Sequence, residues 1–235
     1  MLEVLRRLHS ESTLTEPVVA DLERYLDVTR GEMLFAKGVI LVEGDAERFL
    51  IRQEQRRTVS ISTSTESASA LLAGTQFVAY VELLGLRGLQ IPFAVITDRD
   101  SREDNTDLGV TRVIKLLRAV IAPRVMPLTE ARRLLLAEQN GLFIGEHTLE
   151  ADLFRAGAHE EICDTLIELA RGPRARARAQ AWKDDPDSID AERLLSDIEA
   201  IGKGRVAQRL SSRIVAGHEP AYILNAVRYV RARCR

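Results

Sequence analysis

Residues 38–47 read Gly38-Val39-Ile40-Leu41-Val42-Glu43-Gly44-Asp45-Ala46-Glu47, the form of a buried strand that ends in a glycine turn and an acidic segment. The run 39–42 is apolar on both faces, as expected of a central parallel strand covered by helices on each side. Gly44 permits a tight turn into a helix. Because Glu47 lies four residues after Glu43, both carboxylates are predicted to converge above the end of the strand, where open α/β sheets bind ligands.

A second apolar segment, residues 91–96, is also followed by acidic residues, Asp98 and Asp100. Alternate residues of an extended segment point the same way, so these two carboxylates are predicted to project to one side. Like charges at close range are unfavourable unless a cation or a proton neutralises them. Clusters of oxygen ligands suit magnesium or manganese better than zinc. The sequence therefore predicts a site for a divalent cation.

Strands and helices alternate along the first two thirds of the chain, which predicts an α/β fold with a mostly parallel four-stranded sheet flanked by helices. The predicted strands are 38–43, 58–63, 92–97 and 141–145, and the predicted helices between them are 45–56, 75–85, 108–121 and 128–139. Three parts are expected: an N-terminal helical arm at 1–36, a catalytic domain at 37–157 with a helical insertion at 108–139, and a helical C-terminal subdomain at 158–235. Within that subdomain, residues 172–187 are predicted to form an exposed connection.

The order strand-Glu-Gly-x-x-Glu, followed about fifty residues later by strand-Asp-x-Asp, resembles the TOPRIM domain of topoisomerases, primases and certain nucleases. Within that group the chain most resembles the OLD (overcoming lysogenization defect) family of nucleases. Further segments similar to the C-terminal region of that family are Gly74-Thr75-Gln76-Phe77, Leu83-Leu84-Gly85-Leu86, Thr148-Leu149-Glu150-Ala151-Asp152-Leu153 and Gly202-Lys203-Gly204-Arg205. The resemblance spans about residues 38–210.

This resemblance implies a Mg²⁺- or Mn²⁺-dependent DNA nuclease that hydrolyses phosphodiesters with two metal ions. The implied metal ligands are Glu43, Glu47, Asp98, Asp100 and Glu150. Asp45, Thr148 and Asp152 are expected to assist through water or supporting contacts. Lys203 matches the position of a catalytic lysine, whose ammonium would offset charge in the transition state. The resemblance implies Glu43 and Asp98 as the other catalytic residues.

Arginines recur every four residues after this lysine, at Arg205, Arg209 and Arg213. On a helix they share a face that would track a DNA backbone, although periodic arginines also serve as ordinary solvated surface. The run Arg174, Arg176 and Arg178 is interpreted as a solvated linker rather than a DNA site.

Composition narrows the remaining classes. The chain has 235 residues, 46% of them hydrophobic, and a net charge of −2, so a DNA-binding surface must be local. Its two cysteines, Cys163 and Cys234, form no zinc or disulfide pattern, and no segment suits a membrane span or a signal peptide. We therefore expect a cytoplasmic protein.

What the sequence lacks separates the TOPRIM classes. A primase commonly has a zinc-binding region, which two isolated cysteines cannot form, and a topoisomerase is part of a much larger DNA-gating machine. Of these classes, the nucleases are the one that this chain fits. No Gly-x-x-x-x-Gly-Lys-[Ser/Thr] loop is present, which predicts no ATP site in this chain. Because the family joins its TOPRIM part to an ATPase, we expect a C-terminal fragment whose ATPase domain is missing, from a full-length protein that can form a homo-oligomer.

Two alternatives stay open from the residues. Haloacid-dehalogenase phosphatases also place Asp-x-Asp after a strand, but the Glu-Gly-x-x-Glu element argues against them. A noncatalytic, metal-stabilised DNA-binding or assembly module is the alternative outside the enzymes.

Overall fold

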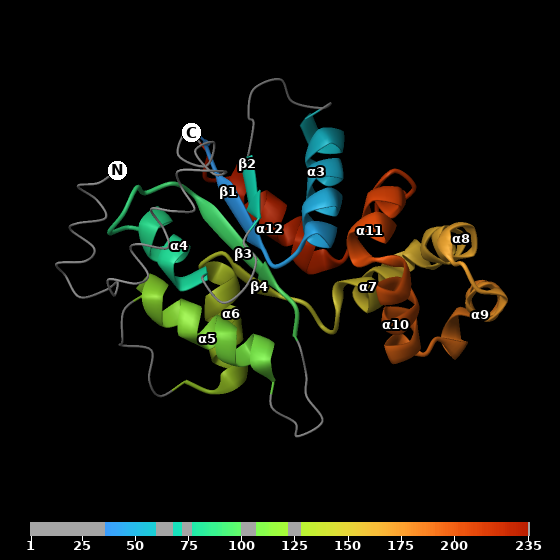
Figure 1. The fold of residues 1–235 in the computed structure, drawn as a ribbon. Coiled ribbons are helices and arrows are strands. Elements are labelled where there is room, and N and C mark those ends of the chain that lie inside the picture. Colours follow the sequence, from blue (N-terminus) through green and yellow to red (C-terminus); the bar gives the residue numbers. More distant parts are fainter. Residues whose placement is uncertain (1–35, 60–67, 72–76, 100–106, 122–127, 235) are drawn as a thin grey trace.

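The computed structural model describes residues 36–59, 68–71, 77–99, 107–121 and 128–234. Four parallel strands form one sheet in the order β2-β1-β3-β4, with helices on both faces (Figure 1). The strands are β1 (Val39–Val42), β2 (Ala68–Leu71), β3 (Phe93–Thr97) and β4 (Leu142–Ile144). This architecture confirms the predicted α/β fold with a parallel sheet flanked by helices.

The alternation of side chains along β1 and β3 divides the interior into two cores. Val39, Leu41 and Val95 face the first core, with helices α4 (Phe77–Leu84), α5 (Leu108–Ile121) and α6 (Glu130–Gln139). Ile40 and Ile96 face the second core. Since successive residues of a strand point to opposite faces, the residues after each strand inherit the same alternation.

The second core extends from the sheet into the C-terminal helices without a break. It includes side chains of α3 (Asp45–Val59), α7 (Leu149–Leu153), the π-helical turn η3 (Phe154–Ala158), α8 (His159–Leu169), α9 (Pro173–Asp184), α10 (Ala191–Ile201), α11 (Lys203–Ser211) and α12 (Ala221–Arg231). A short 3₁₀ turn, η4 (Pro186–Ser188), joins α9 to α10. Helix α12 returns to the sheet beside β3 and β4, whereas α8 to α11 lie to one side of it (Figure 1). In the described part of the chain no helix has the length and apolar character that crossing a membrane requires.

The prediction of a strand at 58–63 is wrong, because helix α3 continues through Val59 and the second strand is Ala68–Leu71. The alternating β-branched residues of 58–63 suggested a strand, but strand propensity depends on context and yields to the helix that crosses back over the sheet. Residues 60–63 lie outside the described residues, as does nearly all of the predicted N-terminal arm.

The prediction of an exposed connection at 172–187 is also wrong, because residues 173–184 form helix α9. Alanine and arginine are good helix formers, and Pro173 suits the first turn. Trp182 is 5% exposed in the second core. Arg178 forms an ion pair with Asp197 of α10, so this arginine joins two helices rather than solvating a linker.

The burial of Trp182 gives a test of this packing. Replacing Trp182 with alanine removes a large side chain from the core and is expected to lower the free energy of unfolding by about 3–5 kcal/mol. Urea denaturation followed by circular dichroism measures the change. Gln180→Ala, at an exposed position of the same helix, is the control. A Trp182→Ala variant as stable as this control would restore the linker interpretation.

Candidate metal site

Glu43 lies at the carboxyl end of β1, beside Thr97 at the end of β3. Leu41 pairs with Val95 in the parallel ladder, so two further residues along each strand bring Glu43 opposite Thr97. The Thr97 hydroxyl donates a hydrogen bond to the Glu43 carboxylate. By strand alternation both side chains point to the side of helix α5, and Arg112 of that helix donates to both of them.

The start of α5 is fixed against the loop that follows β3. Asp107 accepts a hydrogen bond from the Val110 amide at 2.9 Å, a side-chain cap of the first turn. The same carboxylate pairs with Arg99 at 2.5 Å. Gly109 donates to the Arg99 carbonyl at 2.8 Å, and a Cβ at this glycine would overlap the Asp98 carbonyl oxygen. The close approach sets the position of Arg112 one turn further along.

Glu47 lies in the first turn of α3 and is 7% exposed. Burial, followed by the nearby charges of Glu150 and Glu43, raises the pKa of this carboxyl. One of its oxygens, Oε2, is buried and has no hydrogen-bond partner within the described residues. A buried carboxylate oxygen without a donor is costly, and a bound cation would satisfy it.

Asp98 and Asp152 lie near Tyr222 of α12. Burial raises the pKa of the Tyr222 hydroxyl, and the charges of Asp152, Asp98 and Glu47 raise it further. Asp152 is 6% exposed and accepts hydrogen bonds from the backbone amides of Glu146 at 2.9 Å and His147 at 3.2 Å. Asp152 therefore holds the loop after β4.

Gly145 leaves room for this arrangement at the end of β4. A Cβ at Gly145 would lie 2.8 Å from Asp152 Oδ2 and 3.3 Å from the Tyr222 hydroxyl. A cavity of about 560 Å³ beside β4 has Asp152 and Tyr222 in its wall.

The structure thus brings most of the predicted acidic residues to one end of the sheet. Glu47 lies within electrostatic range of Glu43 and Glu150, and Tyr222 within range of Glu47, Asp98 and Asp152. Across the described residues, no three acidic, histidine or cysteine side chains stand in a finished metal-binding arrangement. Asp100 lies outside the described residues, and so does the side chain of Asp45.

Thr148 precedes α7, and its carbonyl oxygen accepts a hydrogen bond from the Asp152 amide at 3.0 Å. This contact orders the helix that carries Glu150, which is 7% exposed. The donor set around Glu47 consists of carboxylate oxygens, one of them buried and without a hydrogen-bond partner among the described residues, and it fits a divalent cation such as Mg²⁺ or Mn²⁺.

Lys203 begins helix α11, and Gly202, with a φ of 108°, forms the joint with α10. Helix α11 packs on α3, which carries Glu47, and α10 packs on α7, which carries Glu150. Its ammonium lies 3.5 Å from the carboxylate of Glu199, and both side chains are about half exposed.

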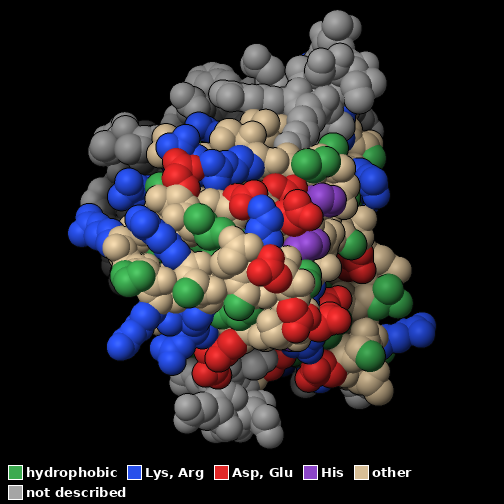
Figure 2. Space-filling view, turned by 90° about the vertical axis from the view of Figure 1, so that its right-hand side faces the viewer, with side chains coloured by type: hydrophobic (Ala, Val, Ile, Leu, Met, Phe, Trp, Pro, Cys, Tyr) green, Lys and Arg blue, Asp and Glu red, His purple; other side chains and the backbone are tan. Residues whose placement is uncertain are grey.

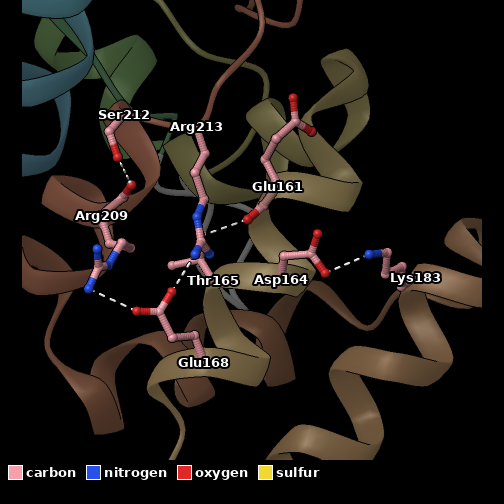
Figure 3. Close-up of polar contacts among 8 residues, drawn as sticks. All are labelled: Glu161, Asp164, Thr165, Glu168, Lys183, Arg209, Ser212 and Arg213. Carbon is pink, nitrogen blue, oxygen red and sulfur yellow. Dashed lines mark hydrogen bonds and ion pairs between the residues drawn. The ribbon is translucent and has the colours of Figure 1, made fainter.

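Two arginines of the predicted DNA-binding stripe contact α8 in this structure (Figure 3). Arg209 lies 2.8 Å from one carboxylate oxygen of Glu168, and Arg213 contacts the other oxygen. Arg213 also donates to the Thr165 hydroxyl at 3.2 Å. Arg205 is exposed at the start of the stripe.

The face formed by the C-terminal helices carries acidic side chains near its middle, with histidines beside them and lysines and arginines concentrated toward one edge (Figure 2). Basic side chains therefore gather locally on this face, with acidic ones among them, although the whole chain is nearly neutral. A local basic surface of this kind is what DNA binding by such a chain would require.

Three residues beside the carboxylates were not predicted from the sequence: Thr97, Arg112 and Tyr222. Thr97 adjoins a predicted acidic pair, and its strand parity with Val95 would have placed it on the α5 side. Arg112 and Tyr222 lie on helices in which the sequence contains no recognised functional motif. Only the fold shows that they reach the carboxylates.

The residues 34–100 match the family model described as overcoming lysogenization defect protein-like, TOPRIM domain. The chain is similar in structure to the C-terminal region of the Burkholderia pseudomallei OLD protein, with 36% identity, a TM-score of 0.76, and coverage of 86% of this chain and 100% of the other. It is also similar to the C-terminal region of the Xanthomonas campestris pv. campestris OLD protein, with 38% identity, a TM-score of 0.73, and coverage of 86% and 95%. No curated protein matches the chain.

The raised pKa of Glu47 predicts how the metal-free protein depends on pH. The folded state holds this proton more tightly than the unfolded state, so stability falls as pH rises from the ordinary glutamate pKa through the raised one. Glu47→Gln cannot ionise, and should raise the free energy of unfolding at neutral pH, with a smaller effect in acid.

Urea unfolding in the presence of a chelator, at pH 5 and at pH 7.5, measures this difference. Glu146→Gln, at an exposed carboxylate nearby, is the control. A Glu47→Gln variant that is less stable than the parent at neutral pH without metal would contradict the account.

Proposed function

The chain belongs to the OLD family, as a C-terminal region with a TOPRIM domain, and we propose that it is a DNA nuclease dependent on Mg²⁺ or Mn²⁺. The observation that carries this proposal is the buried Glu47, which has an oxygen without a hydrogen-bond partner in the described part of the chain and lies near further carboxylates. Acidic groups packed this closely are costly without a cation. DNA is the proposed partner, and the ATPase part of the full-length protein is the proposed regulator.

Phosphodiester hydrolysis needs a water placed against phosphorus, and neutralisation of the charge that develops on the phosphoryl and leaving oxygens. Divalent ions, when bound, supply both an activated water and that neutralisation. Glu43, Glu47 and Asp98 would hold them from β1, α3 and the end of β3. Asp100 and Glu150 complete the proposed ligand set.

The remaining residues orient this set. Asp152 keeps the loop after β4 in place through its two amide contacts, and Thr97 aligns the Glu43 carboxylate. We assign Lys203 the role of stabilising the negative charge of the transition state, since it begins the helix that packs on α3. Its pairing with the exposed Glu199 is weak enough to exchange for a DNA phosphate.

A noncatalytic DNA-binding or assembly module is the second candidate. It is favoured by the lack, within the described residues, of a finished metal-binding arrangement. The two functions differ in whether a divalent cation produces cut DNA.

Cleavage of supercoiled and linear plasmid DNA tests the nuclease. Nicked or linear products should form with Mg²⁺ or Mn²⁺ and not with a chelator. Glu43→Ala and Asp98→Ala should each lower the rate at least about 100-fold, because each removes a proposed metal ligand. Lys203→Ala should lower cleavage and leave DNA binding in place.

Glu192→Ala, at an exposed acidic position of α10, is the matched control and should cut like the parent. A folded chain that binds metal and DNA but cuts neither substrate would favour the noncatalytic module. If the Glu43 and Asp98 variants cut at the parental rate, the carboxylate cluster would not be the nuclease centre.

Arg205 is the arginine of the stripe that we propose as a DNA contact. Arg205→Ala should weaken DNA binding and lower the slope of log affinity against log salt by about 1, the signature of one lost phosphate contact. Arg213→Ala mainly removes an ion pair with Glu168, and should change the slope less. Fluorescence anisotropy with labelled DNA in Ca²⁺ measures both slopes, and equal slopes for all three proteins would contradict this assignment.

A further inference from the structure

Arg112 brings a positive charge into the carboxylate cluster from outside every motif identified in the sequence. Its Nη1 atom donates both to the Glu43 carboxylate and to the Thr97 hydroxyl. The Arg112 and Glu43 side chains are 24% and 27% exposed, so the pair is partly shielded from water. A guanidinium in this position interacts with the carboxylate that Glu43 would offer to a cation.

The packing of helix α5 fixes the position of Arg112. Asp107 caps the first turn of α5, and Gly109 lies against the backbone of Asp98 and Arg99. Val113, the next residue, is buried against the sheet. The helix is therefore held at both its start and its packed face, which directs Arg112 to the end of β1.

The charges around Glu43 explain what a guanidinium does there. Glu47 lies close enough to Glu150 and Glu43 for their negative charges to repel its own. A fixed positive charge beside Glu43 reduces that repulsion when no metal is bound. The same charge competes with a divalent cation for Glu43 and repels it, because both are cations that seek one carboxylate.

We propose that Arg112 is a built-in counter-ion of the site, which holds Glu43 in place before metal binding and sets the affinity of the site for Mg²⁺ or Mn²⁺. This inference rests on the proposed metal-dependent function. Arg112 acts through Glu43 and is therefore a positioning residue. A divalent cation must displace the guanidinium from Glu43, so the arginine lowers metal affinity while it protects the metal-free fold.

Metal affinity of the DNA-free chain tests this directly. Isothermal titration with Mn²⁺ should show that Arg112→Gln binds the ion about tenfold more tightly than the parent, a difference of about 1.4 kcal/mol. Arg112→Lys retains the charge and should stay close to the parent. Lys115→Gln, at an exposed position of the same helix, is the matched control for loss of a nearby positive charge.

The thermal midpoint supplies a second readout. Arg112→Gln should melt earlier than the parent in chelator and show a larger upward shift on addition of Mn²⁺. In a Glu43→Gln background the Arg112→Gln change should no longer alter Mn²⁺ affinity, because the two residues act as a pair. A merely structural arginine would lower the midpoint without tightening the metal.

Failure of this inference is distinct from failure of the nuclease. If the parent binds Mn²⁺ and cuts DNA, while Arg112→Gln binds Mn²⁺ with parental or weaker affinity, the counter-ion role is overturned and the proposed function stands. If the parent binds no Mn²⁺, the proposed metal site is refuted, and so is the role of Arg112.

Discussion

Repulsion between carboxylates at one end of a parallel sheet is the constraint on which the rest of this structure depends. The parallel pairing of β1 with β3 brings the ends of both strands to the same edge, and each strand is followed by acidic residues. Glu47 and Glu150 come to this edge from α3 and α7 and are both less than a tenth exposed. Burial of charge is unfavourable unless it is compensated. Arg112 and the backbone amides that bind Asp152 compensate part of it, and the proposed divalent cation would compensate more.

The helical half of the chain is built around the same edge. One continuous core runs from β1 and β3 through α3 to α8, α9 and α11. Glu168 of α8 contacts Arg209 and Arg213 near the end of α11, and Lys183 of α9 lies 2.5 Å from Asp164 of α8 (Figure 3). Because α11 also packs on α3, these contacts position Lys203 relative to the helix that carries Glu47. The C-terminal helices α8 to α11 thereby brace α3, the helix that carries Glu47.

The sequence predicted those features that a local pattern encodes. The apolar run before Glu43 and the acidic residues after it gave the central strand and the carboxylate edge, and helix α5 was predicted with its observed limits. The second strand was misplaced since 58–63 has strand-like residues but α3 extends into it, and α9 was missed because its arginines suggested solvent while Trp182 packs inside. Arg112 and Tyr222 reach the site through tertiary packing, which no spacing along the chain records. The domain limits and the roles of individual site residues remain predictions.

The location of a bound ion is the most direct test of the claim that this edge is a metal centre. Crystals of the chain soaked in Mn²⁺, measured with X-rays near the manganese absorption edge, would locate the ion by its anomalous scattering. If this edge is a metal centre, a peak will lie in contact with Glu47 and at least one of Glu43 and Asp98, with the Arg112 guanidinium withdrawn from Glu43. A well-ordered site without any peak there at saturating Mn²⁺, or a peak held only by residues elsewhere on the chain, would contradict it.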